Sequence, residues 1–472
     1  MIAFQSATEL VAMLRDRQLS AVEMLAEYQA RVRRFDDKLN SIIWQEPRVD
    51  AIARNATPNS TLAGLPMTVK EAADLAGAPT TWGIPELRRN IAAADSVLVA
   101  RLRAAGATLF GKTNVPLNLG DFQSYNAIYG TTNNPWDLGR TPGGSSGGSA
   151  AALAAGLTGL EMGSDIGGSI RNPAHYCGVF GHKPTYKLIP SRGNAPPGVL
   201  AEPEIAVVGP LARSAADLDL ALDIVAGPDR IETGIRYDLP RLDGRRPADL
   251  KVAVWANDDV APVSRDCERG VMKVADALRR SGASVNLEAR PAFAARDSHN
   301  VYMALLASFI GAGFPEPVFN ELKAQALNIA PDDQSDTARQ TRAQTMDHRG
   351  WVQLNNIREH LRWAWRNFFD EYDVVLAPIA STAAFPHDHS PMETRTIAVD
   401  GSVRPYFEQL FWAGLPGVAY LPATVIPTGN NAAGLPIGIQ IIGPAFGDRI
   451  TIGVARLLEA DGFAFTPPPA YV

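Results

Sequence analysis

The 472-residue sequence has only two cysteines, Cys177 and Cys267, and no run of basic residues. Two cysteines cannot build the disulfide framework of small secreted proteins, so we expect a reducing, cytoplasmic location. With 44 Lys and Arg against 50 Asp and Glu, the net charge is −6. That balance disfavours charge-driven binding to nucleic acid or to anionic membranes. The N-terminal stretch also lacks the positively charged start and apolar core of a secretory signal.

Charged residues are missing altogether from residues 409–447, a length that could suggest a membrane span. Prolines divide this stretch into pieces that are too short to cross a bilayer as helices. They are Pro416, Pro422, Pro427, Pro436 and Pro444. We therefore expect buried strands and turns here, and no membrane association.

Helix and strand patterns alternate along the chain. Ser6 with Glu9 and Ser20 with Glu23 form capping boxes, which predict a pair of N-terminal helices ending near Phe35. Apolar spacing predicts further helices over 96–105, 265–282 and 348–369, and strands ending at residue 70 and over 107–110, 250–255 and 373–379. This alternation predicts an α/β layered fold. The segment 291–347 is the least patterned, and we expect a variable helical region covering a site.

Two turns rich in glycine and serine are the most unusual features: GGSSGGSAAALAAG at 143–156 and GSDIGGSIR at 163–171. The alanine run after the first turn favours a buried helix over a flexible linker. Ser145 and Ser169 are separated by this helix and a short strand, so both turns could face one cleft. Glycines beside a serine also leave backbone N–H groups free for a developing oxyanion.

A phosphate-binding loop is matched formally by GATLFGKT at 106–113. The context is wrong for such a loop, because a predicted helix precedes the first glycine and a predicted strand lies between the two glycines. Pro116 would also obstruct the helix that must follow. We therefore do not expect nucleotide binding.

Together with several other motifs, the two turns resemble the amidase signature family of Ser-cisSer-Lys hydrolases. The other motifs are MTVKEA (67–72), GKTN (111–114), NPW (134–136), CGVFGHKPT (177–185) and LPIGIQIIGP (435–444). The resemblance implies one large α/β/α domain over 1–472 with a central mixed sheet and a signature core at 60–215. It implies neither a cofactor nor a metal.

The resemblance also implies which residues carry out catalysis. The family's nucleophile falls on Ser169, its bridging serine on Ser145 and its lysine on Lys70. In the family the bridging serine follows a cis peptide, which here is Gly144–Ser145. The oxyanion hole corresponds to the backbone N–H groups of Ile166, Gly167, Gly168 and Ser169.

In the family's mechanism, a neutral lysine takes a proton from the bridging serine, which takes one from the nucleophile. The nucleophile attacks the carbonyl carbon, and water then hydrolyses the acyl-enzyme. Keeping Lys70 neutral at pH 7 would cost ~4.6 kcal/mol at an unperturbed pKa of roughly 10.4. We expect burial beside Met67 and Val69 to reduce this cost.

Other residues of the two turns fit supporting roles. We expect Ser149 to cap the alanine-rich helix and Ser146 to hydrogen-bond within the site. Asp165 and Arg171 flank the nucleophile turn, where we expect an ion pair that braces it. Cys177 fits a small buried residue.

The substrate is less well defined by the sequence. The family includes fatty acid amide hydrolase, aryl acylamidases, hydrolases of nylon oligomers or urethanes, and the A subunit of glutamyl-tRNA amidotransferase. His175 and His182 depart from the commonest pattern and resemble the nylon and urethane branch, although their roles stay open. We expect relaxed hydrolysis of small amides, esters or carbamates, including aryl compounds. The alternative is the amidotransferase role, in which the chain is a glutaminase that supplies ammonia to a partner; that relative usually has Thr where Ile166 stands.

Several aromatic residues are candidates for the substrate pocket, with plain core packing as the alternative for each. They are Trp82, Tyr125, Phe407, Phe411 and Trp412. The sequence His387-Asp388-His389 could suggest a metal site, but no further ligands cluster nearby, so we interpret it as a loop. The sequence is compatible with a homodimer.

Overall fold

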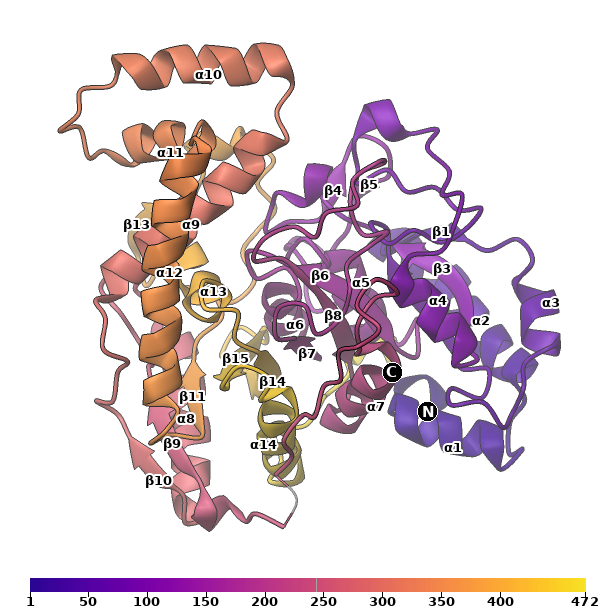
Figure 1. Cartoon of the computed structure of the whole chain (residues 1–472). Coiled ribbons are helices and arrows are strands. Elements are labelled where there is room, and N and C mark those ends of the chain that lie inside the picture. Colours follow the sequence, from indigo (N-terminus) through magenta and orange to yellow (C-terminus); the bar gives the residue numbers. More distant parts are fainter. Residues whose placement is uncertain (243) are drawn as a thin grey trace.

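The centre of the molecule is an eight-stranded mixed sheet (Figure 1). It is seen in a computed structural model that describes residues 1–242 and 244–472. Across the sheet the strands are β10 (Ser284–Asn286), β9 (Lys251–Val254), β11 (Val374–Ala377), β15 (Pro436–Ile442), β14 (Ala423–Asn430), β7 (Phe180–Lys183), β8 (Val207–Ala212) and β6 (Glu161–Asp165). The first three run parallel to one another, and every later neighbour is antiparallel.

A three-stranded sheet continues from the β6 edge. Its order is β1 (Ile42–Gln45), β3 (Thr108–Thr113) and β2 (Pro66–Lys70). The backbone N–H of Thr68 in β2 donates to Thr158 Oγ1, just before β6, at 3.0 Å. The end of β2 therefore lies beside β6. Two short hairpins complete the strands: β4 (Tyr125–Asn126) with β5 (Gly130–Thr131), and β12 (Thr396–Val399) with β13 (Ser402–Pro405).

Helices cover both faces of the large sheet, as predicted. On one face lie α7 (Ala215–Val225), α8 (Arg265–Arg280) and α14 (Asp448–Ala460). Their core cluster includes Ile426 and Ile439, whereas Val425 and Leu211 belong to the cluster of α5 (Gly147–Ala154) and α6 (Arg171–Cys177). Because successive side chains of a strand point to opposite faces, β14 contributes to both clusters. The architecture is α/β/α.

The N-terminal helices are α1 (Ala7–Arg15), α2 (Ala21–Leu39), α3 (Val49–Arg54) and α4 (Val97–Ala104). Both predicted capping boxes are present, with Ser6 Oγ accepting from the Glu9 N–H and Ser20 Oγ from the Glu23 N–H, each at 3.2 Å. α2 runs one turn beyond the predicted end and stops at Asn40, whose φ of 52° is left-handed.

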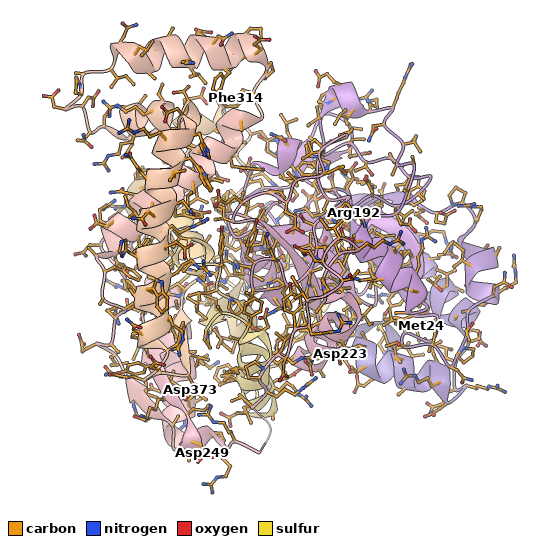
Figure 2. All side chains as sticks on the ribbon, in the orientation of Figure 1. Met24, Arg192, Asp223, Asp249, Phe314 and Asp373 are labelled. Carbon is orange, nitrogen blue, oxygen red and sulfur yellow. The ribbon has the colours of Figure 1, made fainter. Side chains whose placement is uncertain are left out.

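The segment 291–347 contains α9 (Ala295–Ala312), α10 (Glu316–Asn328) and α11 (Asp336–Gln344), and α12 (His348–Phe368) and α13 (Leu410–Gly417) follow. No described residue of α10 is buried, and Figure 2 shows its side chains reaching into open space beyond Phe314. α9 is different, because Tyr302 and Leu305 are buried in a core cluster shared with α13.

The uncharged stretch 409–447 forms α13, β14 and β15, so the expected strands and turns are present together with one short helix. Within the described residues, no helix has both the length and the apolar composition needed to cross a bilayer. The formal phosphate-loop match lies largely within β3.

Candidate active site

Lys70 ends β2 and points its amine at two hydroxyl groups. Lys70 Nζ lies 2.6 Å from Ser145 Oγ and 2.9 Å from Ser164 Oγ. The side chain is buried, with 2% of its surface exposed. Burial lowers the pKa of Lys70 to about 7, although the carboxylates of Asp165 and Glu161 act to raise it. A substantial fraction of this lysine is therefore neutral at neutral pH and able to accept a proton.

The glycines of GGSSGGS let neighbouring backbone segments pack closely against this turn, and the turn is not a flexible linker. A Cβ on Gly144 would overlap the backbone carbonyl oxygen of Asp121, and all seven residues are buried. The peptide Gly144–Ser145 is cis. α5 begins at Gly147, so Ser149 lies inside its first turn and the expected cap at Ser149 is wrong. Ser149 Oγ instead bonds Thr113 Oγ1 at 2.9 Å.

The two Gly/Ser turns lie against each other, as the spacing of their serines suggested. The Ser146 N–H donates to the Ser169 carbonyl oxygen at 3.1 Å, and the Ser164 N–H approaches Ser146 Oγ at 3.4 Å. Ser146 thus makes the expected hydrogen bonds. Ser169 is 7% exposed, and its Oγ makes no hydrogen bond to any residue that the structure describes. The Lys70–Ser145 contact is therefore formed in this state, while the Ser169 hydroxyl is available to a ligand.

Asp165 fixes the turn that carries Ser169. Its carboxylate accepts from the backbone N–H groups of Gly168 at 2.9 Å and Ile170 at 3.1 Å. This finding differs from the expectation for Gly168, because the N–H of that residue is already donated to Asp165. Among the described residues, none accepts from the N–H groups of Ile166, Gly167 and Ser169. Three of the four expected oxyanion donors are therefore free.

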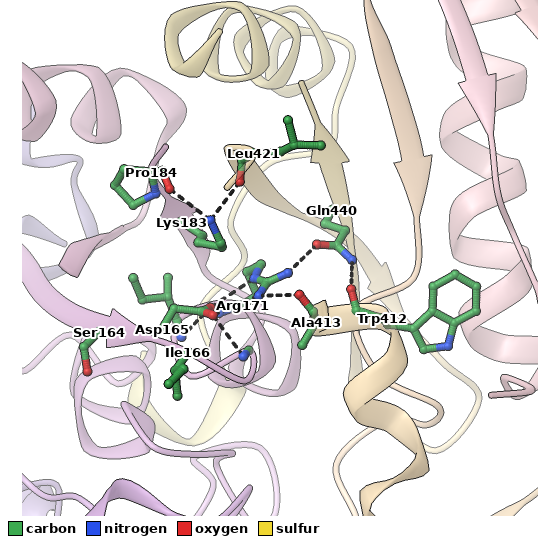
Figure 3. Close-up of polar contacts among 12 residues, drawn as sticks. Ser164, Asp165, Ile166, Arg171, Lys183, Pro184, Trp412, Ala413, Leu421 and Gln440 are labelled. Atoms are coloured by element: carbon green, nitrogen blue, oxygen red, sulfur yellow. Dashed lines mark hydrogen bonds and ion pairs between the residues drawn. The ribbon is translucent and has the colours of Figure 1, made fainter. Parts of the chain in front are cut away.

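Arg171 connects this turn to the rest of the sheet, as Figure 3 shows. Its guanidinium donates to Asp165 at 2.8 and 3.0 Å, to Gln440 Oε1 at 2.9 Å and to the Ala413 carbonyl oxygen at 3.0 Å. The expected ion pair of Asp165 and Arg171 is present and fully buried. Burial alone would raise the pKa of Asp165, but the Arg171 charge holds it at about 2. The turn that carries Ser169 is thus bonded through Arg171 to both β15 and α13.

Comparison with known proteins identifies the family of this chain. The family model described as Amidase matches residues 23–452. The chain belongs to the amidase family. It is 30% identical to fatty-acid amide hydrolase 2 of Homo sapiens, over 96% of this chain and 88% of that protein. It is 31% identical to the A subunit of the glutamyl-tRNA(Gln) amidotransferase of Chromohalobacter salexigens, with 96% of each covered.

Among solved structures, 6-aminohexanoate cyclic dimer hydrolase complexed with substrate is similar, with a TM-score of 0.76, 26% sequence identity and 97% of each chain covered. The protein is accordingly an amidase, a hydrolase of carbon–nitrogen bonds other than peptide bonds.

Two polar residues of this amidase were not singled out from the sequence: Ser164, which lies in the site, and the buried Lys183. Ser164 shares Lys70 Nζ with Ser145, and its place just before Asp165 in the second turn was the available signal. Lys183, in the motif GHKPT, is buried and donates to the carbonyl oxygens of Pro184 and Leu421 at 3.0 and 2.8 Å. Burial lowers the pKa of Lys183 to about 7.

The two histidines whose roles the sequence left open join elements of the amidase fold. His175 Nδ1 accepts from the Gly438 N–H at 2.6 Å, so Nε2 carries the proton and donates to the Thr382 carbonyl oxygen at 3.0 Å. Burial lowers the pKa of His175 to about 4, which keeps it neutral. His182 is buried between Thr424 and Asp448. Both histidines pack within the fold.

The expected pocket residues divide into two groups. Phe411 and Trp412 are buried core residues. Phe411 is 1% exposed, and Trp412 is 0% exposed and donates Nε1–H to the Ala261 carbonyl oxygen. Their burial matches the core packing that the sequence left open as the alternative, and their assignment to the pocket stays a prediction. Tyr125 is partly buried and its hydroxyl accepts from Arg395 at 2.6 Å, and Phe407 is partly buried within the same core cluster as Phe411.

Trp82 is partly buried, and its backbone N–H donates to the Glu71 carboxylate at 2.9 Å. His387, Asp388 and His389 lie in a loop, as interpreted. No group of three or more potential metal ligands is found within residues 1–242 and 244–472. Cys177 and Cys267 are buried free thiols.

Proposed function

We propose that this amidase hydrolyses amides through an acyl-enzyme, with Ser169 as nucleophile, Ser145 as proton relay and Lys70 as base. The observation that carries the proposal is the 2.6 Å contact between Lys70 Nζ and Ser145 Oγ in a buried site. A lysine acts as a base only when it is deprotonated, and burial lowers the pKa of this one to about 7.

The proposed steps use these residues in the order Lys70, Ser145 and Ser169. Neutral Lys70 takes the Ser145 proton, Ser145 takes the Ser169 proton, and Ser169 Oγ attacks the amide carbon. The free N–H groups of the turn bind the oxyanion, with Gly167 and Ser169 among them. The proton returns through Ser145 to the leaving amine as the carbon–nitrogen bond breaks. Water then attacks the acyl-enzyme by the same route, which releases the carboxylic acid.

The proposed substrates are small amides, with aryl amides and carbamates among them, and esters as competing substrates. Similarity to 6-aminohexanoate cyclic dimer hydrolase supports a small-molecule substrate. Ile166 supports an apolar wall of the substrate pocket, because it packs beside the core cluster of α13. The proposal treats the chain as one cytoplasmic domain with its signature core at 60–215. The helices of 291–347 then form a side of the site, since α9 reaches the nucleophile turn.

The experiment compares p-nitroacetanilide, a phenyl carbamate and a simple aliphatic amide as substrates for the wild type and for Ser169→Ala. A fluorophosphonate probe should label the wild type with one adduct and leave the variant unlabelled. Activity in Ser169→Ala equal to that of the wild type would contradict the proposed nucleophile. The absence of hydrolysis of any amide, ester or carbamate would contradict the proposed reaction.

The second candidate is the A subunit of a tRNA-dependent amidotransferase, which the 31% identity to such a protein favours. It predicts glutaminase activity and co-purification with a partner protein. Hydrolysis of p-nitroacetanilide by the isolated chain, without glutaminase activity, would decide for the free-standing amidase.

A further inference from the structure

Tyr302, in the middle of α9, touches the nucleophile turn directly. Its hydroxyl donates to the Ile166 carbonyl oxygen at 3.0 Å, and the whole side chain is buried. The ring packs on α13, where a Cβ on Gly414 would overlap Tyr302 Cδ1. This contact joins the helical segment 291–347 to the turn that carries Ser169.

The Ile166 carbonyl and the Gly167 N–H are the two ends of one peptide plane and point in opposite directions. A hydrogen bond that holds the carbonyl therefore also fixes the direction of the N–H. We infer that Tyr302 is a positioning residue for the oxyanion hole, because its hydroxyl holds the Ile166–Gly167 peptide with the Gly167 N–H directed at the substrate oxygen. The inference rests on the proposed function, in which Ser169 is the nucleophile.

Two other observations favour this role. Asp165 also holds the turn, because it accepts from the Gly168 N–H. Tyr302 and Asp165 therefore fix adjacent peptides and leave the Gly167 N–H between them free. Burial raises the pKa of Tyr302, so the hydroxyl stays protonated and can act as a donor. A hydrogen bond accepted by the carbonyl also polarises the amide and strengthens its N–H as a donor.

The alternative is that Tyr302 only fills the core between α9 and α13. Tyr302→Phe separates the two roles, because it keeps the ring and removes the hydroxyl. We expect kcat to fall roughly ten-fold with KM within about two-fold, which is less than the 10²–10³-fold loss when an oxyanion donor itself is removed. Trifluoroacetophenone, whose adduct with serine places an oxyanion in the hole, should bind roughly ten-fold more weakly.

Tyr28→Phe is the matched control. Tyr28 is also fully buried, and its hydroxyl contacts Arg213 at 3.4 Å, far along the chain from the turn. We expect this variant to keep wild-type kcat on p-nitroacetanilide and wild-type affinity for trifluoroacetophenone. Equal kcat and inhibitor affinity in Tyr302→Phe and the wild type would overturn the inference, whereas an inactive wild type would overturn the proposed function instead.

A second pair of variants tests the same contact without changing Tyr302. Gly414→Ala must displace the Tyr302 ring, while Gly417→Ala places a Cβ at 3.6 Å from Tyr302 Cε2, an ordinary packing distance. We expect Gly414→Ala to lower kcat at least as much as Tyr302→Phe and Gly417→Ala to keep kcat. Equal kcat values for the two alanine variants would argue against a positioning role, even if Tyr302→Phe did not fold.

Discussion

Replacing Lys70 by methionine should abolish activity and make the protein more stable. Folding lowers the pKa of Lys70 from 10.5 to about 7 by burying its amine. A shift of this size corresponds to about 4–5 kcal/mol of destabilisation at pH 7. Methionine avoids this cost but loses the hydrogen bonds to Ser145 and Ser164, worth about 1 kcal/mol each. We expect a net gain of about 2–3 kcal/mol at pH 7.

The stability gain of Lys70→Met over the wild type should be larger at pH 7 than at pH 10. Between pH 10.5 and about 7, the unfolded chain holds Lys70 protonated and the folded chain does not. Wild-type stability therefore falls as the pH is lowered, by up to about 1.4 kcal/mol per pH unit from this group. Below about pH 7 both states bind the proton, and the loss levels off. The advantage of Lys70→Met should grow from pH 10 to 7 and then stay constant.

The assay is urea unfolding of the wild type and Lys70→Met at unit pH steps from 6 to 10. Lys251→Met is the control, since Lys251 is exposed on β9 whereas Lys70 is buried. We expect the stability difference between Lys251→Met and the wild type to be small at every pH. If Lys70→Met were no more stable than the wild type at pH 7, or if its advantage did not change with pH, the burial argument would be refuted.

Three further predictions follow from the site. The kcat/KM of the wild type should fall about ten-fold per pH unit below about pH 7, where Lys70 becomes protonated; a pH–rate profile that stays flat to pH 5 would contradict this. Gly144→Ala should lose nearly all activity because its Cβ would overlap a backbone carbonyl oxygen, whereas Gly120→Ala, with its nearest atom at 3.6 Å, should keep activity. Arg171→Met should lower the free energy of unfolding by about 3–5 kcal/mol because it leaves Asp165 buried without its cation, as thermal or urea unfolding would show.

The sequence alone predicted the local parts of this structure well. Capping boxes, the strand ending at Lys70 and the two Gly/Ser turns depend on neighbouring residues, and each is present. The predictions that differ from the structure depended on the directions in which N–H groups and side chains point. A sequence shows four N–H groups around Gly168 but not that Asp165 occupies one of them. It shows that Trp412 is aromatic but not that its side chain is buried in the core.

The supports of the nucleophile turn were hardest to predict because they come from distant parts of the chain. Lys70, Ser145 and Ser169 all lie within 60–215, so this segment contains every proposed reacting side chain. The turn itself is also held by Gln440 on β15 through Arg171 and by Tyr302 on α9. Three short motifs within this segment, one for each proposed reacting side chain, were enough to identify these residues from the sequence. The orientation of the oxyanion donors requires helices and strands from the C-terminal half, so the arrangement proposed for catalysis depends on nearly the whole fold.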